Sequence, residues 1–310
     1  MSNTVEPSLV SEIHSSRQQF LALVAALRPD LHRYCARMTG SVTDGEDIVQ
    51  ETLARAYYAL PELHTLPPLR SWLFRIAHNA ALDHLRRYDR RMGRPLDDVD
   101  DPVDETRGAD DELSASEAVQ AAVTRFLQLP PAQRSCVVLK DVLGHSVEEI
   151  TSLVGLSIPA VKAALHRGRE TLRKTAAAAK EETTSATPPP SAEMARYVAL
   201  FNAHDWEGVR ALLAEDVRLD LVSRSRRNGR GEVAGYFGNY EAFGGWHLVP
   251  AWLGGREVVA VFRSENDSVP AYFIELSFKE GQLSSIKDFR YVPYIVTDAH
   301  LVCRSANATP

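Results

Sequence analysis

An acidic segment constrains this chain more than any other feature of its sequence. Residues 96–117 hold ten acidic side chains and one basic side chain, with few large apolar residues among them. Such a segment repels itself and has too little apolar surface to join a core, so we expect an extended linker over residues 95–117. A second linker is predicted at residues 181–192, where three consecutive prolines, 188–190, must stop a helix. The chain is therefore predicted to fold as three modules.

The modules differ in charge, which suggests that they have different partners. We place them at residues 15–94, 118–180 and 193–303. The chain carries a net charge of −6, yet residues 1–95 carry +2 and residues 118–180 carry +5. Two basic blocks beside an acidic linker are typical of a protein that binds a polyanion, although basic faces are often only solvated surface.

Composition favours a soluble protein of a reducing compartment. The chain is 45% hydrophobic and 25% charged, as globular proteins are, and it has no run of about 18 apolar residues that would span a membrane. Its first basic residue is Arg17, so its start does not resemble a secretory signal. The cysteines lack the spacing of a metal site or a disulfide framework: Cys35, Cys136 and Cys303. We therefore expect a cytoplasmic protein.

The first module is predicted to be helical. Apolar residues recur at helical spacing between residues 44 and 60, at Val49, Leu53, Ala56 and Leu60. Pro61 should end this helix. A second helix over about residues 71–91 should bury the apolar residues Trp72, Leu73, Ile76, Ala77 and Ala80. Its other face carries the polar residues Arg75, Asn79, Arg86 and Arg90, with Arg87 beside them.

The second module carries a helix-turn-helix pattern. Ser146 and Glu149 form a capping box at the start of a short helix, and Gly155 supplies the turn that follows it. Ser157 is placed to cap the next helix, whose inward residues are Val161, Leu165, Gly168 and Leu172. Its exposed face holds Pro159, Lys162, Ala163, His166 and Arg167. A small and basic face of this kind suits insertion into the major groove of DNA.

The third module is predicted to be α+β. Two amphipathic helices are expected over residues 194–203 and 206–214. Strand-like runs follow at residues 257–262, 271–278 and 283–291. Glycine-containing turns at residues 254–255 and 280–281 indicate hairpins, so we expect consecutive antiparallel strands.

Two motifs of the first module resemble region 2 of bacterial sigma factors of the extracytoplasmic-function (ECF) type. They are DGEDIVQETL at residues 44–53 and RSWLFRIAHN at residues 70–79. The second module, from Leu129 to Arg169, resembles region 4 of the same family. The third module resembles SnoaL-like members of the nuclear-transport-factor-2 superfamily, through FNAHDW at residues 201–206 and IKDFRY at residues 286–291. This resemblance implies two all-α sigma domains followed by a cone-shaped α+β domain.

The resemblance also implies partners and residue roles. The residues expected to dock on the β′ clamp helices of core RNA polymerase are Asp44, Glu46, Asp47, Gln50 and Glu51. Those expected to bind the −10 promoter element are Arg75, Asn79, Arg86, Arg87 and Arg90, with Asp83 orienting an arginine. Those expected at the −35 element are Lys162, Ala163, His166, Arg167, Arg169 and Arg173. Further expected partners are the polymerase β flap, an anti-sigma factor and the third module itself, which is predicted to pack on the sigma domains.

The sequence predicts no catalytic residue, no metal site and no cofactor. The titratable residues of the third module, Asp220, His247 and Asp288, have no fixed catalytic spacing, and Tyr236 or Tyr291 could partner them. One alternative is a small-molecule sensor or SnoaL-like enzyme fused to a DNA-binding module. Another is a helix-turn-helix regulator that acts without polymerase. The motif at residues 44–53 favours the sigma factor.

Overall fold

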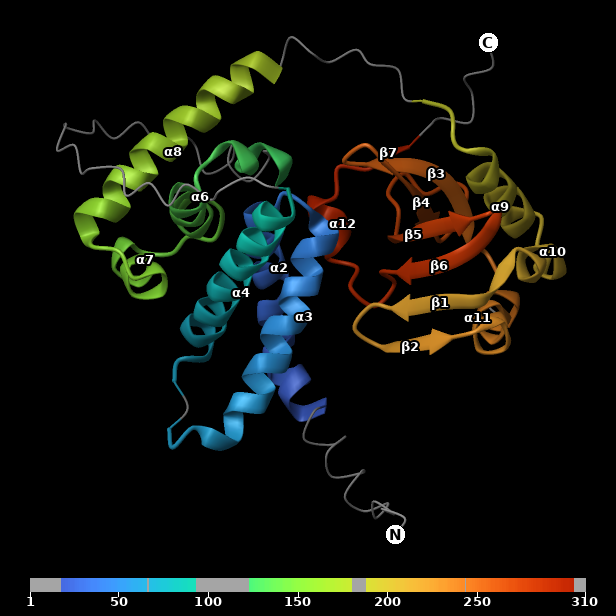
Figure 1. Cartoon of the computed structure of the whole chain (residues 1–310), viewed down its shortest axis with the longest axis horizontal. Coiled ribbons are helices and arrows are strands. Elements are labelled where there is room, and N and C mark those ends of the chain that lie inside the picture. Colours follow the sequence, from blue (N-terminus) through green and yellow to red (C-terminus); the bar gives the residue numbers. More distant parts are fainter. Residues whose placement is uncertain (1–17, 66, 93–122, 180–187, 243, 304–310) are drawn as a thin grey trace. The chain divides into compact units, whose positions relative to one another are not determined.

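The computed structural model describes residues 18–65, 67–92, 123–179, 188–242 and 244–303. The chain divides into two compact units, residues 1–182 (unit 1) and residues 183–310 (unit 2), and each has its own hydrophobic core. Figure 1 shows helices in the first and a sheet flanked by helices in the second. Within the described ranges, no helix combines the length and the apolar character needed to cross a membrane.

Unit 1 is helical in all its described regular structure, as the sequence predicted. Its longer helices are α2 (Arg28–Thr39), α3 (Val42–Ala59), α4 (Leu69–Met92), α6 (Pro131–Val137), α7 (Val147–Val154) and α8 (Ile158–Ala179). Shorter helical segments are η1 (Ala25–Leu27), η2 (Leu60–Glu62), η3 (Val123–Gln128) and the π-helical η4 (Val138–Val142).

Helices α2 and α3 pack closely because of a glycine inside α3. A Cβ on Gly45 would lie 2.6 Å from the backbone of Ala36, so only glycine allows this approach. The predicted apolar stripe faces inward, with Val49, Leu53 and Ala56 buried. Ser41 caps α3 by accepting a hydrogen bond from the Asp44 amide, which starts the helix two residues before the predicted boundary.

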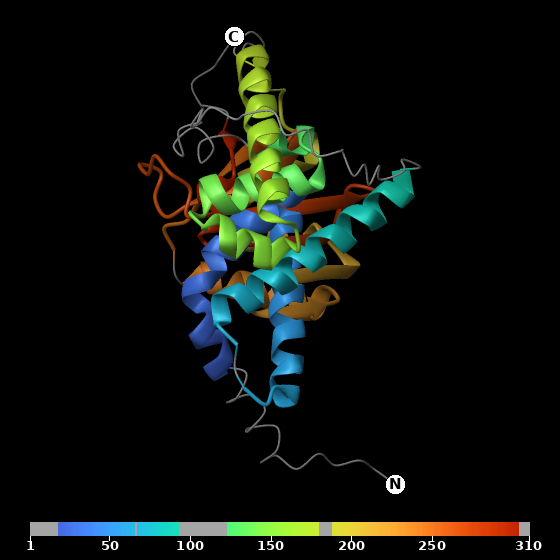
Figure 2. The same ribbon diagram turned by 90° about the vertical axis from the view of Figure 1, so that its left-hand side faces the viewer.

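One hydrophobic core joins helices from both sides of residues 93–122. Buried side chains of α2 and α4, such as Tyr34 and Phe74, belong to the same cluster as Cys136 of α6 and Val161 of α8. Helix α2 contacts η3 and α6, and α4 contacts α7 (Figure 1 and Figure 2). The two modules expected on either side of the acidic segment are therefore packed together in unit 1.

Unit 2 is an α+β fold, as predicted. Its helices are α9 (Ala192–Asn202), α10 (Trp206–Ala211), α11 (Arg230–Ala242) and α12 (Ile295–Asp298). Its strands are β1 (Leu213–Leu221), β2 (Ser225–Asn228), β3 (His247–Leu253), β4 (Arg256–Phe262), β5 (Tyr272–Lys279), β6 (Gln282–Asp288) and β7 (Val302–Cys303). They form one sheet in the order β2-β1-β6-β5-β4-β3-β7.

Three features of unit 2 differ from the sequence prediction. The helix expected to end at Ala214 ends at Ala211, because Leu213 already pairs with Leu283 in the sheet. Strand β1 lies parallel to β6, where antiparallel neighbours were expected. Helix α11 was not predicted, since three glycines weaken its helical pattern. The two glycine hairpins are confirmed by positive φ angles at Gly255 and Gly281.

Candidate nucleic-acid interface

The outer face of α4 carries a row of exposed polar residues. Its inner face buries Leu73, Ala77 and Ala80 as predicted, while Trp72 and Ile76 are half-buried at the edge of the core. All five residues predicted for the −10 element are exposed on this helix: Arg75, Asn79, Arg86, Arg87 and Arg90. The structure thus brings four arginines and an amide to one exposed helix surface, where phosphates can approach them.

Acidic residues lie within ion-pair distance of two arginines of this surface. Asp83 lies 3.8 Å from Arg86, which is within ion-pair distance. Glu51 of α3 accepts a hydrogen bond from Arg55 at 2.5 Å and lies 3.8 Å from Arg87. These pairs are solvent-exposed, so each stabilises the fold by at most about 1 kcal/mol. Their main effect is to link the acidic end of α3 to the arginines of α4.

The predicted polymerase surface loses one of its five residues. Asp44, Asp47, Gln50 and Glu51 are exposed or half-buried along α3. Glu46 is fully buried, and its carboxylate accepts a hydrogen bond from Arg28 at 2.7 Å. A buried carboxylate needs such a partner because water no longer solvates it. In this structure Glu46 therefore joins α3 to the start of α2 and is not part of the exposed surface.

The helix-turn-helix forms as the sequence predicted. Ser146 and Glu149 make both hydrogen bonds of the capping box at the start of α7. Gly155 ends α7 with a φ angle of 74°, a conformation that favours glycine. Ser157 accepts a hydrogen bond from the Ala160 amide in the first turn of α8. These caps fix the angle at which the second helix leaves the turn.

Helix α8 presents the face predicted for the −35 element. Val161, Leu165, Gly168 and Leu172 are buried, as expected. Opposite them, Lys162 and His166 are exposed and Ala163 and Arg167 are half-buried, and Arg173 is exposed further along the helix. Arg169 differs from the prediction: it donates two hydrogen bonds to buried Asp141, at 2.6 and 2.9 Å. Asp141, which the sequence did not single out, thus anchors α8 to η4.

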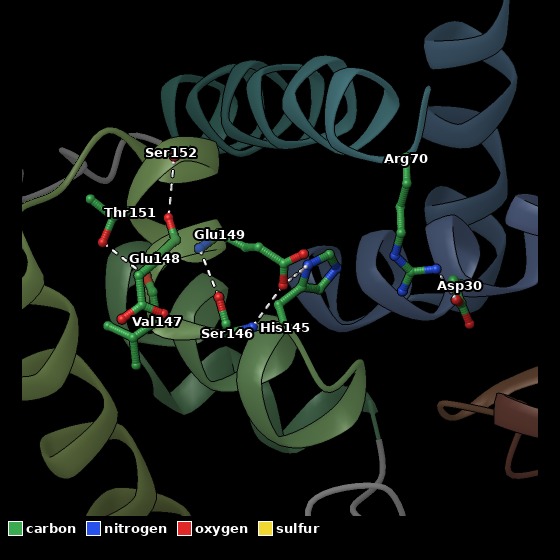
Figure 3. A network of polar contacts seen from close by, with 9 residues as sticks. All are labelled: Asp30, Arg70, His145, Ser146, Val147, Glu148, Glu149, Thr151 and Ser152. Carbon is green, nitrogen blue, oxygen red and sulfur yellow. Dashed lines mark hydrogen bonds and ion pairs between the residues drawn. The ribbon is translucent and has the colours of Figure 1, made fainter. Parts of the chain in front are cut away.

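A second set of polar residues lies where α7 meets α4 (Figure 3). His145 is buried, and its ring packs edge-on against Phe74 at 5.2 Å. Its Nδ1 lies 3.4 Å from the carboxylate of Glu149, and Arg70 forms an ion pair with Asp30 at 2.8 Å nearby (Figure 3). Burial and the positive charge of Arg70 lower the pKa of His145, so the ring is neutral at pH 7.

Buried hydrogen bonds also join α2 and α4 to α6. The Tyr34 hydroxyl lies 2.7 Å from His78 Nδ1 and 2.8 Å from Ser135 Oγ. Burial lowers the pKa of His78 to about 4. Arg134 of α6 is buried too, and its guanidinium donates to the carbonyls of Met38 at the end of α2 and of Leu129. Burial lowers the pKa of Arg134 to about 10, and its side chain remains charged.

The titratable candidates of unit 2 do not converge on one site. Asp288 is buried in the core, where it accepts hydrogen bonds from Tyr236 at 2.6 Å and Tyr240 at 3.4 Å. Asp220 lies on the opposite face of the sheet, because Leu221 is the residue that pairs with Asp288. Burial raises the pKa of Asp288. Across the described ranges, no group of three or more histidine, cysteine or acidic side chains is placed to hold a metal ion.

Comparison with known proteins agrees with this arrangement. Residues 23–91 match the Sigma-70 region 2 family, residues 120–172 match Sigma-70 region 4, and residues 194–280 match the SnoaL-like domain family. The chain is 34% identical over 212 residues to the ECF RNA polymerase sigma factor SigG of Mycobacterium tuberculosis, a match that covers 61% of this chain and 57% of SigG. It is 30% identical over 168 residues to the ECF sigma factor SigW of Bacillus subtilis, covering 50% of this chain and 87% of SigW.

A similar solved structure is that of the Mycobacterium tuberculosis ECF sigma factor SigJ. The match has 21% sequence identity and a TM-score of 0.35, and it covers 86% of this chain and 95% of SigJ. The helical unit, its helix-turn-helix and the two sigma-70 matches define a protein of the sigma-70 class. With SigW matched over most of its length, the chain belongs to the family of ECF RNA polymerase sigma factors.

Proposed function

We propose that this protein directs RNA polymerase to promoters in the bacterial cytoplasm and starts transcription there. The observation that carries the proposal is the presence of two exposed basic helix faces in one chain, on α4 and on α8, each within a sigma-70 match. Basic residues along α4 suit the opened, single-stranded −10 element. The small basic face of α8, the second helix of the helix-turn-helix, suits the major groove at the −35 element. The protein catalyses no reaction in this role.

The acidic surface of α3 is proposed to bind core polymerase. Its members are Asp44, Asp47, Gln50 and Glu51, which would face the β′ clamp helices, while region 4 would face the β flap. Reversing one exposed charge, Asp47→Arg, should weaken binding of core polymerase at least ten-fold in a pull-down or anisotropy titration. Glu62→Arg changes charge equally at another exposed acidic residue, so it is the matched control and should bind as wild type.

Promoter binding should require the two halves of unit 1 to separate. The −35 and −10 elements are centred about 25 base pairs apart, which is about 85 Å along B-form DNA. A compact unit of this size has a radius of gyration of about 15 Å, so it cannot reach both elements while α2, α4 and α6 share one core. The 30 residues from 93 to 122 reach at most about 100 Å when fully extended, which is enough to connect separated halves.

The test is run-off transcription with bacterial core polymerase on the DNA upstream of this protein's own gene. Lys162→Ala should reduce transcript several-fold, whereas Lys174→Ala, exposed further along α8, should not. A chain ended at residue 182 retains the whole core of unit 1, and its transcript level relative to the full chain gives the sign of the effect of unit 2. An anti-sigma factor would bind the acidic surface of α3 that is proposed to bind core polymerase, and would compete with the polymerase for it. No transcript together with no core binding would overturn the proposal.

A further inference from the structure

Arginines concentrate around the first hairpin of unit 2. Residues 183–310 carry 13 basic and 15 acidic side chains, yet five of the basic ones fall within 13 positions, at Arg218, Arg224, Arg226, Arg227 and Arg230. These residues lie on strands β1 and β2, on the turn between them and at the start of α11. The positive charge is therefore a local feature of this hairpin and does not follow from the composition of the unit.

Several of these guanidinium groups are available to a ligand. Arg226 is paired with Asp220 at 3.1 Å and Arg230 with Glu215 at 2.9 Å. Among the described residues, Arg218, Arg224 and Arg227 have no carboxylate within ion-pair distance, and Arg218 and Arg224 are exposed. Strand β2 is at the edge of the sheet, so nothing in the sheet covers its outer side.

An exposed tyrosine adjoins the hairpin. Strands β1 and β6 are parallel and end on the same side of the sheet, where the β1–β2 turn begins (Figure 1). The Val222 amide of the turn donates to the carbonyl of Asp288 at 3.0 Å, and Tyr291 follows shortly after Asp288. Arg224 lies over the Tyr291 ring, 5.5 Å from its centre, and Tyr291 is 46% exposed. Stacking on the ring restrains the long Arg224 side chain and holds its charge at the surface.

We infer that Arg218, Arg224 and Arg226 form a phosphate-binding surface for duplex DNA, with Tyr291 positioning Arg224. Guanidinium groups bind phosphate oxygens through paired N–H donors. Arg218 and Arg226 share one face of the strand pair, because Arg226 pairs with Asp220, two residues after Arg218. Arg227 pairs with the core residue Leu219 and projects from the other face, so it is not part of this surface. DNA is the occupant because, on the proposed function, unit 2 is tethered to helices that bind promoter DNA, which gives it a high effective concentration at the duplex. The surface would add sequence-independent affinity to the contacts of α4 and α8.

The test is the salt dependence of DNA binding by the full-length chain. Fluorescence anisotropy with a labelled 40-base-pair duplex would compare wild type with the triple variant Arg218→Ala, Arg224→Ala, Arg226→Ala. The logarithm of the binding constant falls linearly with the logarithm of the salt concentration, and each lost phosphate contact lowers the magnitude of this slope by about 0.9. We therefore expect the magnitude of the slope to decrease by about 2–3, and binding at low salt to be at least ten-fold weaker. The matched control, Arg196→Ala, Arg263→Ala, Lys279→Ala, removes the same charge from exposed positions elsewhere in unit 2.

Each outcome decides the inference. A lower slope in the hairpin variant, with the control close to wild type and both variants melting normally, supports it. Equal weakening in both variants would show an effect of net charge alone and would overturn it. If the hairpin variant binds as wild type while Lys162→Ala binds more weakly, the inference falls and the proposed function stands. If wild type and all variants fail to bind promoter DNA with core polymerase present, the proposed function falls as well.

Discussion

The hydroxyls of Tyr34 in α2 and Ser135 in α6 lie 2.8 Å apart inside the core of unit 1, although 101 positions separate them in the sequence. His78 completes the group, since its Nδ1 lies 3.2 Å from Ser135 as well as 2.7 Å from Tyr34. A buried hydrogen-bonded group of this kind fixes one arrangement of the helices, because any other packing leaves polar atoms without partners. The halves of unit 1 are therefore held together by specific bonds in addition to apolar contact.

Removing the Tyr34 hydroxyl should weaken this junction modestly. In Tyr34→Phe, His78 and Ser135 can still bond to each other, so we expect a loss of about 1 kcal/mol in the free energy of unfolding. Urea unfolding of the full chain, followed by helical circular dichroism, measures the change. Tyr58→Phe is the control because Tyr58 is 78% exposed, and it should unfold as wild type. Equal stability of wild type and Tyr34→Phe would show that the hydroxyl contributes nothing.

Arg134 should control how often the two halves separate. Its charged group holds the end of α2 by donating to Met38, so Arg134→Ala leaves buried carbonyls without a donor. Thiol reactivity reports the separation, since Cys35 and Cys136 are buried and burial raises the pKa of Cys136 to about 12. In a Cys303→Ser background, which removes the exposed thiol, we expect Arg134→Ala to react with a disulfide reagent at least ten times faster. Exposed Arg173→Ala should leave the rate unchanged.

Acid should destabilise unit 1 through His78. The pKa of His78 is about 4 in the folded protein and about 6.5 when unfolded, so between these values the unfolded chain binds more protons. The contribution of His78 to the free energy of unfolding is fully present above pH 6.5. It decreases by about 2 kcal/mol between pH 7.5 and pH 5. His145 contributes with the same sign. In His78→Asn, unfolding free energy should change less over this range, and an unchanged pH dependence would contradict the assignment.

Local sequence signals predicted most of the elements and few of the contacts between them. The capping box at Ser146, the stop at Gly155 and the apolar stripe through Val49 depend on neighbours within one helix, and all three are confirmed. The bond from Tyr34 to Ser135 depends on packing across residues 93–122, and no periodic pattern marks either residue. The burial of Glu46 has another cause. The family resemblance assigned it to the polymerase surface, but it stands three residues before Val49 and seven before Leu53, so helical spacing places it beside the apolar stripe, where α2 packs.

Two glycines in helices should respond to alanine with opposite signs. Gly45→Ala forces a Cβ to within 2.6 Å of the Ala36 backbone, so overpacking should exceed the helical preference of alanine and cost about 1–2 kcal/mol. Gly235→Ala in α11 meets nothing within 4 Å among the described atoms, so it should stabilise unit 2 by up to about 1 kcal/mol. Differential scanning calorimetry of the full chain can resolve both shifts. A stabilising Gly45→Ala would contradict the close approach of α2 and α3.

Two buried tyrosines of unit 2 provide a matched comparison of hydroxyl groups. Tyr236 donates to Asp288 at 2.6 Å, and burial raises the pKa of that carboxyl group. Tyr236→Phe removes this donor and should cost about 2 kcal/mol of unfolding free energy, as expected for a bond to an acidic group. The Tyr197 hydroxyl is also buried, but it has no hydrogen-bond partner among the described residues.

Tyr197→Phe should therefore leave the stability of unit 2 unchanged or raise it slightly, because it removes a desolvated polar atom that forms no compensating bond. Both variants delete one oxygen from a fully buried ring, so differences in packing cancel in the comparison. Thermal unfolding at pH 7 measures each change. If the two variants lose equal stability, Tyr197 must bond to a water molecule or ligand in solution. The hydrogen bond from Tyr236 to Asp288 would then contribute no more to the free energy of unfolding than the bond of Tyr197 does.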